Sequence, residues 1–170
     1  MHVSLVGSEM CIRDSVKPLR NNEKNFKILF IGSVTDRKKP HLIVEAMNNF
    51  NSKDIKLYIV GPTPNENYLS QLKKLVQEYD LVDQVSFTGS IDRKSVMDHY
   101  ADTNLMILPS VSEGLARVIF ESQVTACPVL VTDAPGMGDI VIDGQTGYIF
   151  ESDNLCLLYT SPSPRDLRAS

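Results

Sequence analysis

Two carboxylates, Glu113 and Glu121, lie eight positions apart in the segment PSVSEGLARVIFE, which runs over residues 109–121. Glu113 follows an apolar run at 105–108, and Glu121 lies in a stretch whose apolar residues recur at helical spacing. At about 1.5 Å rise per residue, such a helix separates the two carboxylates by up to roughly 12 Å, enough to contact both ends of an extended polar ligand. A solvated glutamate pair beside a turn fits the same spacing, so both interpretations stay open.

The two ends of the chain are related to each other at the nucleic-acid level. One codon choice for Cys156–Asp166 has a reverse complement that, read in another frame, translates as LVGSEMCIRD, the sequence of Leu5–Asp14. Natural termini have no reason to be inverted copies, whereas the DNA looks like a sequencing-library adapter. We therefore expect residues 1–15 and 155–170 to be translated adapter that takes no part in the fold, as an expression scar would. The expected native segment is 16–154.

Composition excludes several classes of function. The chain has 17 Lys and Arg against 21 Asp and Glu, a net charge of −4, which gives no support for binding nucleic acid. Of three cysteines only Cys127 lies outside the expected tails, so the segment offers neither a disulfide framework nor zinc-ligand spacing. The lack of a disulfide framework favours a reducing, cytoplasmic location. No apolar run is long enough to cross a bilayer.

Expected strands and helices alternate along 16–154, which predicts an α/β fold with a Rossmann-like, doubly wound parallel sheet of about six strands. In such sheets ligands bind beyond the carboxyl ends of the strands, where five glycines fall in this sequence. There is no GxGxxG fingerprint, so a dinucleotide-dependent dehydrogenase loses support. The expected strands are 26–31, 55–60, 85–88, 105–108, 129–132 and 147–150; the expected helices are 40–50, 67–79, 92–101, one after Gly114 and a turn at 139–142.

Other catalytic chemistry is sparse in this segment. His41 and His99 have no partner visible in the sequence, and both are interpreted as structural. The segment has no Ser-His-Asp order, no cluster of metal ligands and no DxD motif.

A family pattern covers about Lys27–Phe150 and is carried by FKILFIGSVTDRKKPHLIVEAM, LYIVGP and the stretch from VSFTGS to GQTGYIF. It resembles the donor-binding, C-terminal domain of retaining, two-domain (GT-B) glycosyltransferases of family 4, the glycosyl transferases group 1. The acidic pair, with its flanking Pro-Ser and Gly-Leu steps, is the strongest motif. The resemblance implies one half of a GT-B fold, a UDP-sugar or GDP-sugar as donor substrate, and neither a metal nor another cofactor.

The resemblance also implies catalytic and ribose-binding roles for three charged residues. Glu121 would accept hydrogen bonds from the ribose hydroxyls, each worth about 1.5–3 kcal/mol when the acceptor is charged. Glu113 would face the transferred sugar. Lys38 would neutralise the departing diphosphate, with a solvated Arg37-Lys38-Lys39 charge run as the alternative.

The remaining donor-binding positions follow from the same resemblance and consist mostly of backbone. Glycine lets a ligand approach the chain closely, and a helix start offers free N–H groups to a sugar or diphosphate. These positions are Gly32 and Ser33 after the first strand, Gly89 and Ile91 beside the base, and Gly114, Leu115 and Ala116 at the helix start.

Ser33 departs from the family pattern, which commonly has an arginine that pairs with the diphosphate at this position. A serine cannot supply a bidentate charged fork. Either Lys38, with its neighbours Arg37 and Lys39, supplies the positive charge, or the donor is held less tightly.

Three further residues of the motif region differ from the pattern or stay ambiguous. Ala126 stands where glycine is common. Ala116 takes the proline position of a branch reading EGLPRV, which is rich in bacterial surface-polysaccharide enzymes. Arg117 would contact the donor if it pointed inward, and a surface position is equally compatible with its place in the helix.

The expected function is retaining transfer of a sugar, hexosyltransferase-like, to an unknown glycan or lipid-linked acceptor. The chain alone is expected to be inactive because it lacks the acceptor domain, and the full-length protein could lie peripherally at the inner membrane face. Two alternatives stay open. One is a sugar-nucleotide 2-epimerase, which shares the two-domain fold, although EGLARVIFE favours the transferase. The other is a non-catalytic nucleotide-binding module, to which only Ser33 points.

Overall fold

The computed structural model of the chain describes residues 25–50, 52–113 and 116–150. The expected adapter-derived tails at 1–15 and 155–170 lie outside the described residues, as do Gly114 and Leu115. The elements follow in the order β1 (Phe26–Ile31), the 3-10 helix η1 (Asp36–Lys38), α2 (His41–Phe50), β2 (Ile55–Val60), α3 (Glu66–Glu78), β3 (Val85–Gly89), α4 (Arg93–Asp102), β4 (Leu105–Leu108), α5 (Arg117–Val124), β5 (Val129–Thr132) and β6 (Tyr148–Phe150).

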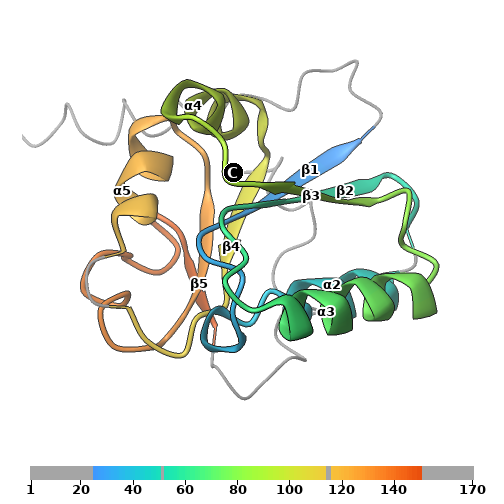
Figure 1. Cartoon of the computed structure of the whole chain (residues 1–170). Coiled ribbons are helices and arrows are strands. Elements are labelled where there is room, and N and C mark those ends of the chain that lie inside the picture. Colours follow the sequence, from blue (N-terminus) through green and yellow to red (C-terminus); the bar gives the residue numbers. More distant parts are fainter. Residues whose placement is uncertain (1–24, 51, 114–115, 151–170) are drawn as a thin grey trace, which may run out of the picture.

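These strands form one parallel sheet in the order β3-β2-β1-β4-β5-β6. Helices α2 and α3 lie on one face of the sheet and α4 and α5 on the other (Figure 1). This arrangement confirms the predicted α/β, Rossmann-like fold. It follows from right-handed crossover connections, which place a helix over the sheet between successive parallel strands.

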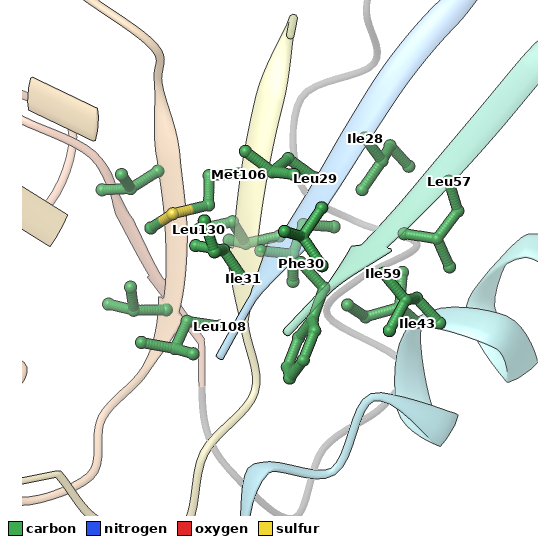
Figure 2. Packing of buried hydrophobic residues seen from close by; sticks show 14 of the residues in the cluster. Ile28, Leu29, Phe30, Ile31, Ile43, Leu57, Ile59, Met106, Leu108 and Leu130 are labelled. Atoms are coloured by element: carbon green, nitrogen blue, oxygen red, sulfur yellow. The ribbon is translucent and has the colours of Figure 1, made fainter. Parts of the chain in front are cut away.

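The core lies on both faces of the central strands because those strands are apolar apart from Lys27 in β1 and Lys56 in β2, each the second residue of its strand. Leu29 and Phe30 of β1 and Met106 of β4 have no exposed surface. Figure 2 shows these side chains within the core cluster, with Ile43 of α2 beside Ile59 of β2. A strand buried on both faces reads as a continuous apolar run, which explains why the sequence located these strands well.

Two helix starts are fixed by side-chain caps. The carboxylate of Asp92 accepts hydrogen bonds from the backbone N–H groups of Lys94 and Ser95, at 2.9 and 3.1 Å, and so begins α4. Asn65 caps α3 in the same way through the N–H of Tyr68, at 3.1 Å. Each such cap satisfies backbone donors that the first helical turn leaves free.

The prediction of a helical turn at 139–142 is wrong. Residues 135–140 form consecutive hydrogen-bonded turns, and no described residue between Thr132 and Tyr148 belongs to a helix. The segment begins with Pro135 followed by Gly136, whose φ of 86° lies in the left-handed region and interrupts a right-handed helix.

Candidate functional site

The predicted site residues gather where the order of the strands reverses. β1 and β4 are neighbours, and their connections leave toward opposite faces of the sheet. Such a switch point opens a crevice outside the carboxyl ends of the two strands, where open α/β sheets bind ligands. The loop after β1 carries Gly32, Ser33 and Lys38, and the loop after β4 carries Glu113.

Lys38 and Glu113 meet across this crevice. The Nζ atom of Lys38 lies 2.7 Å from Oε1 of Glu113, and the two side chains are only 13% and 9% exposed. Lys38 is therefore no part of a solvated charge run, although Arg37 beside it is exposed. Glu113 is likewise not a solvated glutamate beside a turn. Charges this well buried are screened weakly by salt.

The loops after β1 and β4 are joined by further hydrogen bonds. The N–H of Val111 donates to the carbonyl of Arg37 at 3.0 Å, and the guanidinium of Arg37 donates to the carbonyl of Ser112 at 3.4 Å. The N–H of Glu113 donates to the carbonyl of Pro135 at 3.1 Å, which ties the same loop to the segment after β5. Hydrogen bonds therefore hold together the two loops that carry Lys38 and Glu113.

Ser110 is a site residue whose side chain had no predicted role. It is completely buried, and its hydroxyl donates to Oε1 of Glu113 at 2.5 Å. The carbonyl of Ser110 accepts a hydrogen bond from the hydroxyl of Thr132, at the end of β5. The available signal was a small polar residue two positions after a buried strand, at the sheet edge where ligands bind.

Glu121 lies in α5, as predicted, and its carboxylate contacts Tyr100 of α4. The hydroxyl of Tyr100 lies 3.2 Å from Oε2 of Glu121 and 3.2 Å from the carbonyl of Val118. Burial, and next the charge of Glu121, raise the pKa of Tyr100. Its hydroxyl therefore stays protonated at neutral pH and donates to the carboxylate. The sequence did not single out this tyrosine.

An apolar recess lies at the ends of β1 and β2 and includes two predicted donor-binding residues, Gly32 and Ile91. Its volume is about 230 Å³. An apolar cavity of about 150 Å³ already holds benzene, so a heterocyclic ring fits this space. Gly89, also predicted here, ends β3, and its carbonyl accepts the N–H of Gly61 at 2.9 Å. The lining residues are Ile31, Gly32, Val60, Gly61, Pro62, Ser90, Ile91 and Val96.

Gly61 is required at the floor of this recess. Its φ of 139° is unfavourable for any residue with a side chain, and a Cβ atom there would lie 2.1 Å from the carbonyl oxygen of Gly32. The backbones after β1 and β2 thus approach more closely than a side chain permits.

The other predicted positions lie around this framework. Ser33 is half-buried next to Gly32, and Ala116 is 3% exposed at the residue that precedes α5. Arg117 is exposed, so it occupies the surface position that its helical place allowed. Gly114 and Leu115 lie outside the described residues.

The two histidines have ring partners that the sequence did not reveal. Nδ1 of His41 lies 2.8 Å from the hydroxyl of Tyr68, and His99 stacks at a tilt against Tyr58. Burial raises the pKa of Tyr68 to about 12, so this hydroxyl is protonated at neutral pH. Within the described ranges, no three His, Cys, Asp or Glu side chains are grouped to hold a metal ion.

The profile of one family, Glycosyl transferases group 1, matches residues 12–155. The chain belongs to this family. It is 28% identical over 137 residues to the capsular polysaccharide biosynthesis glycosyltransferase CapM of Staphylococcus aureus, which covers 75% of this chain and 33% of CapM. The chain thus spans about a third of the length of the curated relatives it matches.

Solved structures share the fold of this group 1 glycosyl transferase chain. The Anabaena protein HepE, in complex with UDP and glucose, superposes with a TM-score of 0.74 at 20% identity, over 95% of this chain and 44% of HepE. The C-terminal domain of LpcC from Francisella tularensis superposes with a TM-score of 0.71 at 22% identity, over 95% of this chain and 87% of that domain. The Rossmann-like fold expected for half of a GT-B glycosyltransferase is confirmed. No helix among the described residues of the chain is long and apolar enough to cross a membrane.

Proposed function

We propose that residues 16–154 form the donor-binding domain of a family 4 glycosyltransferase, which moves a sugar, a hexose or a related one, from a nucleoside-diphosphate sugar to an acceptor with retention of configuration. Membership of the group 1 family supports the reaction class. The observation that carries the proposal is the pairing of a buried lysine with a buried glutamate at the switch point of the sheet, at 2.7 Å. Lys38 would be the cation that a departing diphosphate requires, and Glu113 would accept hydrogen bonds from sugar hydroxyls.

The donor would extend from the apolar recess toward the Lys38–Glu113 pair. The base would lie against Ile91 in the recess, and Glu121 would accept the ribose hydroxyls. The diphosphate would lie between Lys38 and the first turn of α5, whose free N–H groups and dipole favour an anion. Glu113 would contact the transferred sugar. Gly32, Ser33, Gly89 and the backbone of Gly114, Leu115 and Ala116 would complete the donor site.

Lys38 would supply more of the positive charge that faces the diphosphate, because Ser33 stands where the family commonly has arginine. A single ammonium on a flexible stem is a point charge and lacks the planar fork of a guanidinium. Stabilisation of the departing diphosphate by this lysine and by the helix start needs no metal, so we propose a reaction without a metal or another cofactor.

The donor class is a UDP-sugar or a GDP-sugar. HepE was crystallised with UDP and glucose, which supports UDP as the first probe. CapM takes part in capsular polysaccharide biosynthesis, which supports a glycan or lipid-linked acceptor for the whole protein. A cytoplasmic location, with peripheral contact at the inner membrane face, fits such an acceptor.

Isothermal titration of the 170-residue chain with UDP and with GDP tests the donor half of the proposal. At least one nucleotide should bind, and Glu121→Ala should weaken that binding at least tenfold, which is the loss of one charge-assisted hydrogen bond of about 1.5 kcal/mol. Absence of binding to folded protein would contradict the proposal. Unchanged affinity in Glu121→Ala would instead favour a nucleotide-binding module without this site. In a full-length homologue, turnover of UDP-GlcNAc without an acceptor would favour the epimerase.

A further inference from the structure

Ser110 holds the Glu113 carboxylate from a position that no ligand can reach. It has no exposed surface, and its hydroxyl lies 2.5 Å from Oε1 of Glu113. We propose that Ser110 is a positioning residue for sugar recognition: it keeps Glu113 in its binding orientation when Lys38 turns from the carboxylate to the diphosphate of the donor. This inference rests on the proposed function.

Two donors converge on the same oxygen of Glu113. Lys38 lies 2.7 Å from Oε1 and the Ser110 hydroxyl lies 2.5 Å from it, whereas no donor from the described residues contacts Oε2. A carboxylate oxygen accepts more than one hydrogen bond, and Oε2 is left for a sugar hydroxyl. Oε1 is therefore the anchored end of the carboxylate, and Oε2 is the end that meets the substrate.

The two donors on Oε1 differ in how far they can move. Lys38 has a long stem of rotatable bonds, and a diphosphate competes with Glu113 for its ammonium group. Ser110 has a single rotatable bond to its hydroxyl and is buried on all sides. When the lysine is drawn to the phosphates, the serine remains as the donor that prevents the carboxylate from rotating.

The backbone around Ser110 is itself braced on three sides. Its carbonyl accepts the hydroxyl of Thr132, which is 1% exposed. The next residue, Val111, bonds through its N–H to the loop after β1, and Glu113 bonds through its N–H to the carbonyl of Pro135. Because three neighbouring segments fix this turn, the Ser110 hydroxyl cannot follow a carboxylate that rotates away. A fixed donor of this kind supports a binding residue by limiting its rotamers.

The test compares the affinities of the 170-residue chain for a nucleotide and its sugar nucleotide, using UDP with UDP-glucose and GDP with GDP-mannose. The sugar increment is the Kd of the nucleotide divided by the Kd of the sugar nucleotide. Ser110→Ala should lower the increment of the preferred pair about fivefold to tenfold, which is less than the effect of losing a charge-assisted hydrogen bond to the donor itself, because the Glu113 carboxylate remains and only its orientation is lost. The affinity for the nucleotide alone should stay within about twofold of wild type, since Lys38 is retained. Ser110→Cys, which nearly keeps the volume but donates weakly, should lower the increment in the same direction.

Ser122→Ala is a matched control. Ser122 is also completely buried, and its hydroxyl donates to the carbonyl of Cys127 at 2.8 Å, inside the core. Thermal unfolding of both variants separates a loss of stability from a loss of sugar recognition. The Ser122 variant should keep the wild-type increment. In a Glu113→Gln background, Ser110→Ala should have no further effect, because the carboxylate that it positions is gone.

Different failures point to different errors. If folded wild-type protein binds no nucleoside diphosphate, the proposed function and this inference both fail. If the wild type binds nucleotides but shows no sugar increment, or if Glu113→Gln lowers the increment and Ser110→Ala does not, only the inference fails. A Ser110→Ala variant that loses equal affinity for the nucleotide and its sugar nucleotide, or loses no more of the increment than Ser122→Ala, shows a purely structural serine and overturns the inference.

Discussion

Substitutions at Lys38 and Glu113 should change nucleotide affinity in opposite directions. In the structure the Lys38 ammonium is paired with Glu113 at 2.7 Å, so a diphosphate must compete with this carboxylate for the same cation. Lys38→Met removes the cation and should weaken UDP binding at least tenfold, since a charge-assisted hydrogen bond contributes about 1.5–3 kcal/mol. Glu113→Gln frees the cation and removes a negative charge, so UDP should bind about fivefold more tightly, an increase of on the order of 1 kcal/mol.

The same pair also predicts an unequal effect on stability. Its two side chains are 13% and 9% exposed, so Lys38→Met leaves a buried carboxylate with Ser110 as its remaining side-chain donor. Removing one partner of a buried ion pair costs about 3–5 kcal/mol. The matched control is Lys53→Met, because Lys53 pairs with Asp80 at 3.0 Å where both side chains are largely exposed. An exposed pair contributes about 0–1 kcal/mol.

Urea unfolding followed by circular dichroism measures the stabilities, and isothermal titration with UDP measures the affinities. GDP replaces UDP if it is the nucleotide that the wild type binds. Equal losses of unfolding free energy in Lys38→Met and Lys53→Met would refute the prediction that the buried Lys38–Glu113 pair contributes more to stability than the exposed Lys53–Asp80 pair. A Glu113→Gln variant that binds the nucleotide more weakly than wild type would refute the competition between carboxylate and diphosphate.

Three other perturbations follow from the structure. Tyr100→Phe removes the hydroxyl 3.2 Å from Glu121 and keeps the packed ring, so UDP affinity should fall about threefold to tenfold by titration; an unchanged affinity would show that the hydroxyl does not orient the carboxylate. Gly61→Ala places a Cβ 2.1 Å from a backbone carbonyl at a φ of 139°, so the free energy of unfolding should fall by about 1–3 kcal/mol or more in urea melts, and a stable variant would contradict this geometry. Burial lowers the pKa of His41 below 6.5, so the unfolded chain takes up the proton first as the pH falls, and this residue costs stability below about pH 6.5. Measured from pH 7.5 to 5, the stability of wild type relative to His41→Phe should decrease, and a constant difference would contradict the burial of a neutral imidazole hydrogen-bonded to Tyr68.

The sequence predicted the elements of the fold well because each carries a local signal. The central strands are apolar except for one lysine each in β1 and β2, and two helices begin at polar caps, Asn65 before α3 and Asp92 before α4. The prediction of a helical turn at 139–142 was wrong, because the preceding Pro135 and Gly136 favour non-helical turns.

Only part of the site could be predicted from the sequence, because the residues that contact each other there lie far apart along the chain. Glu113 was expected at the step from strand to helix, where it lies, but its contact with Lys38, 75 positions away, depends on β1 and β4 being neighbours in the sheet. The hydroxyls of Ser110 and Tyr100 could not be assigned, because the direction of a buried hydroxyl is set by packing and leaves no periodic signal. The family resemblance predicted the residues that would contact a ligand, and the structure adds Ser110 and Tyr100, whose hydroxyls contact the carboxylates of Glu113 and Glu121.

Proton–nitrogen correlation spectra of the ¹⁵N-labelled chain, titrated with UDP and with GDP, test the central claim most directly. If the chain binds a nucleoside diphosphate at the switch point of its sheet, the amide signals of Gly32 and Ile91 and those of the first turn of α5 should shift together and saturate at one Kd. Neither nucleotide shifting these signals in a folded chain, or shifts confined to other parts of the molecule, would contradict the claim.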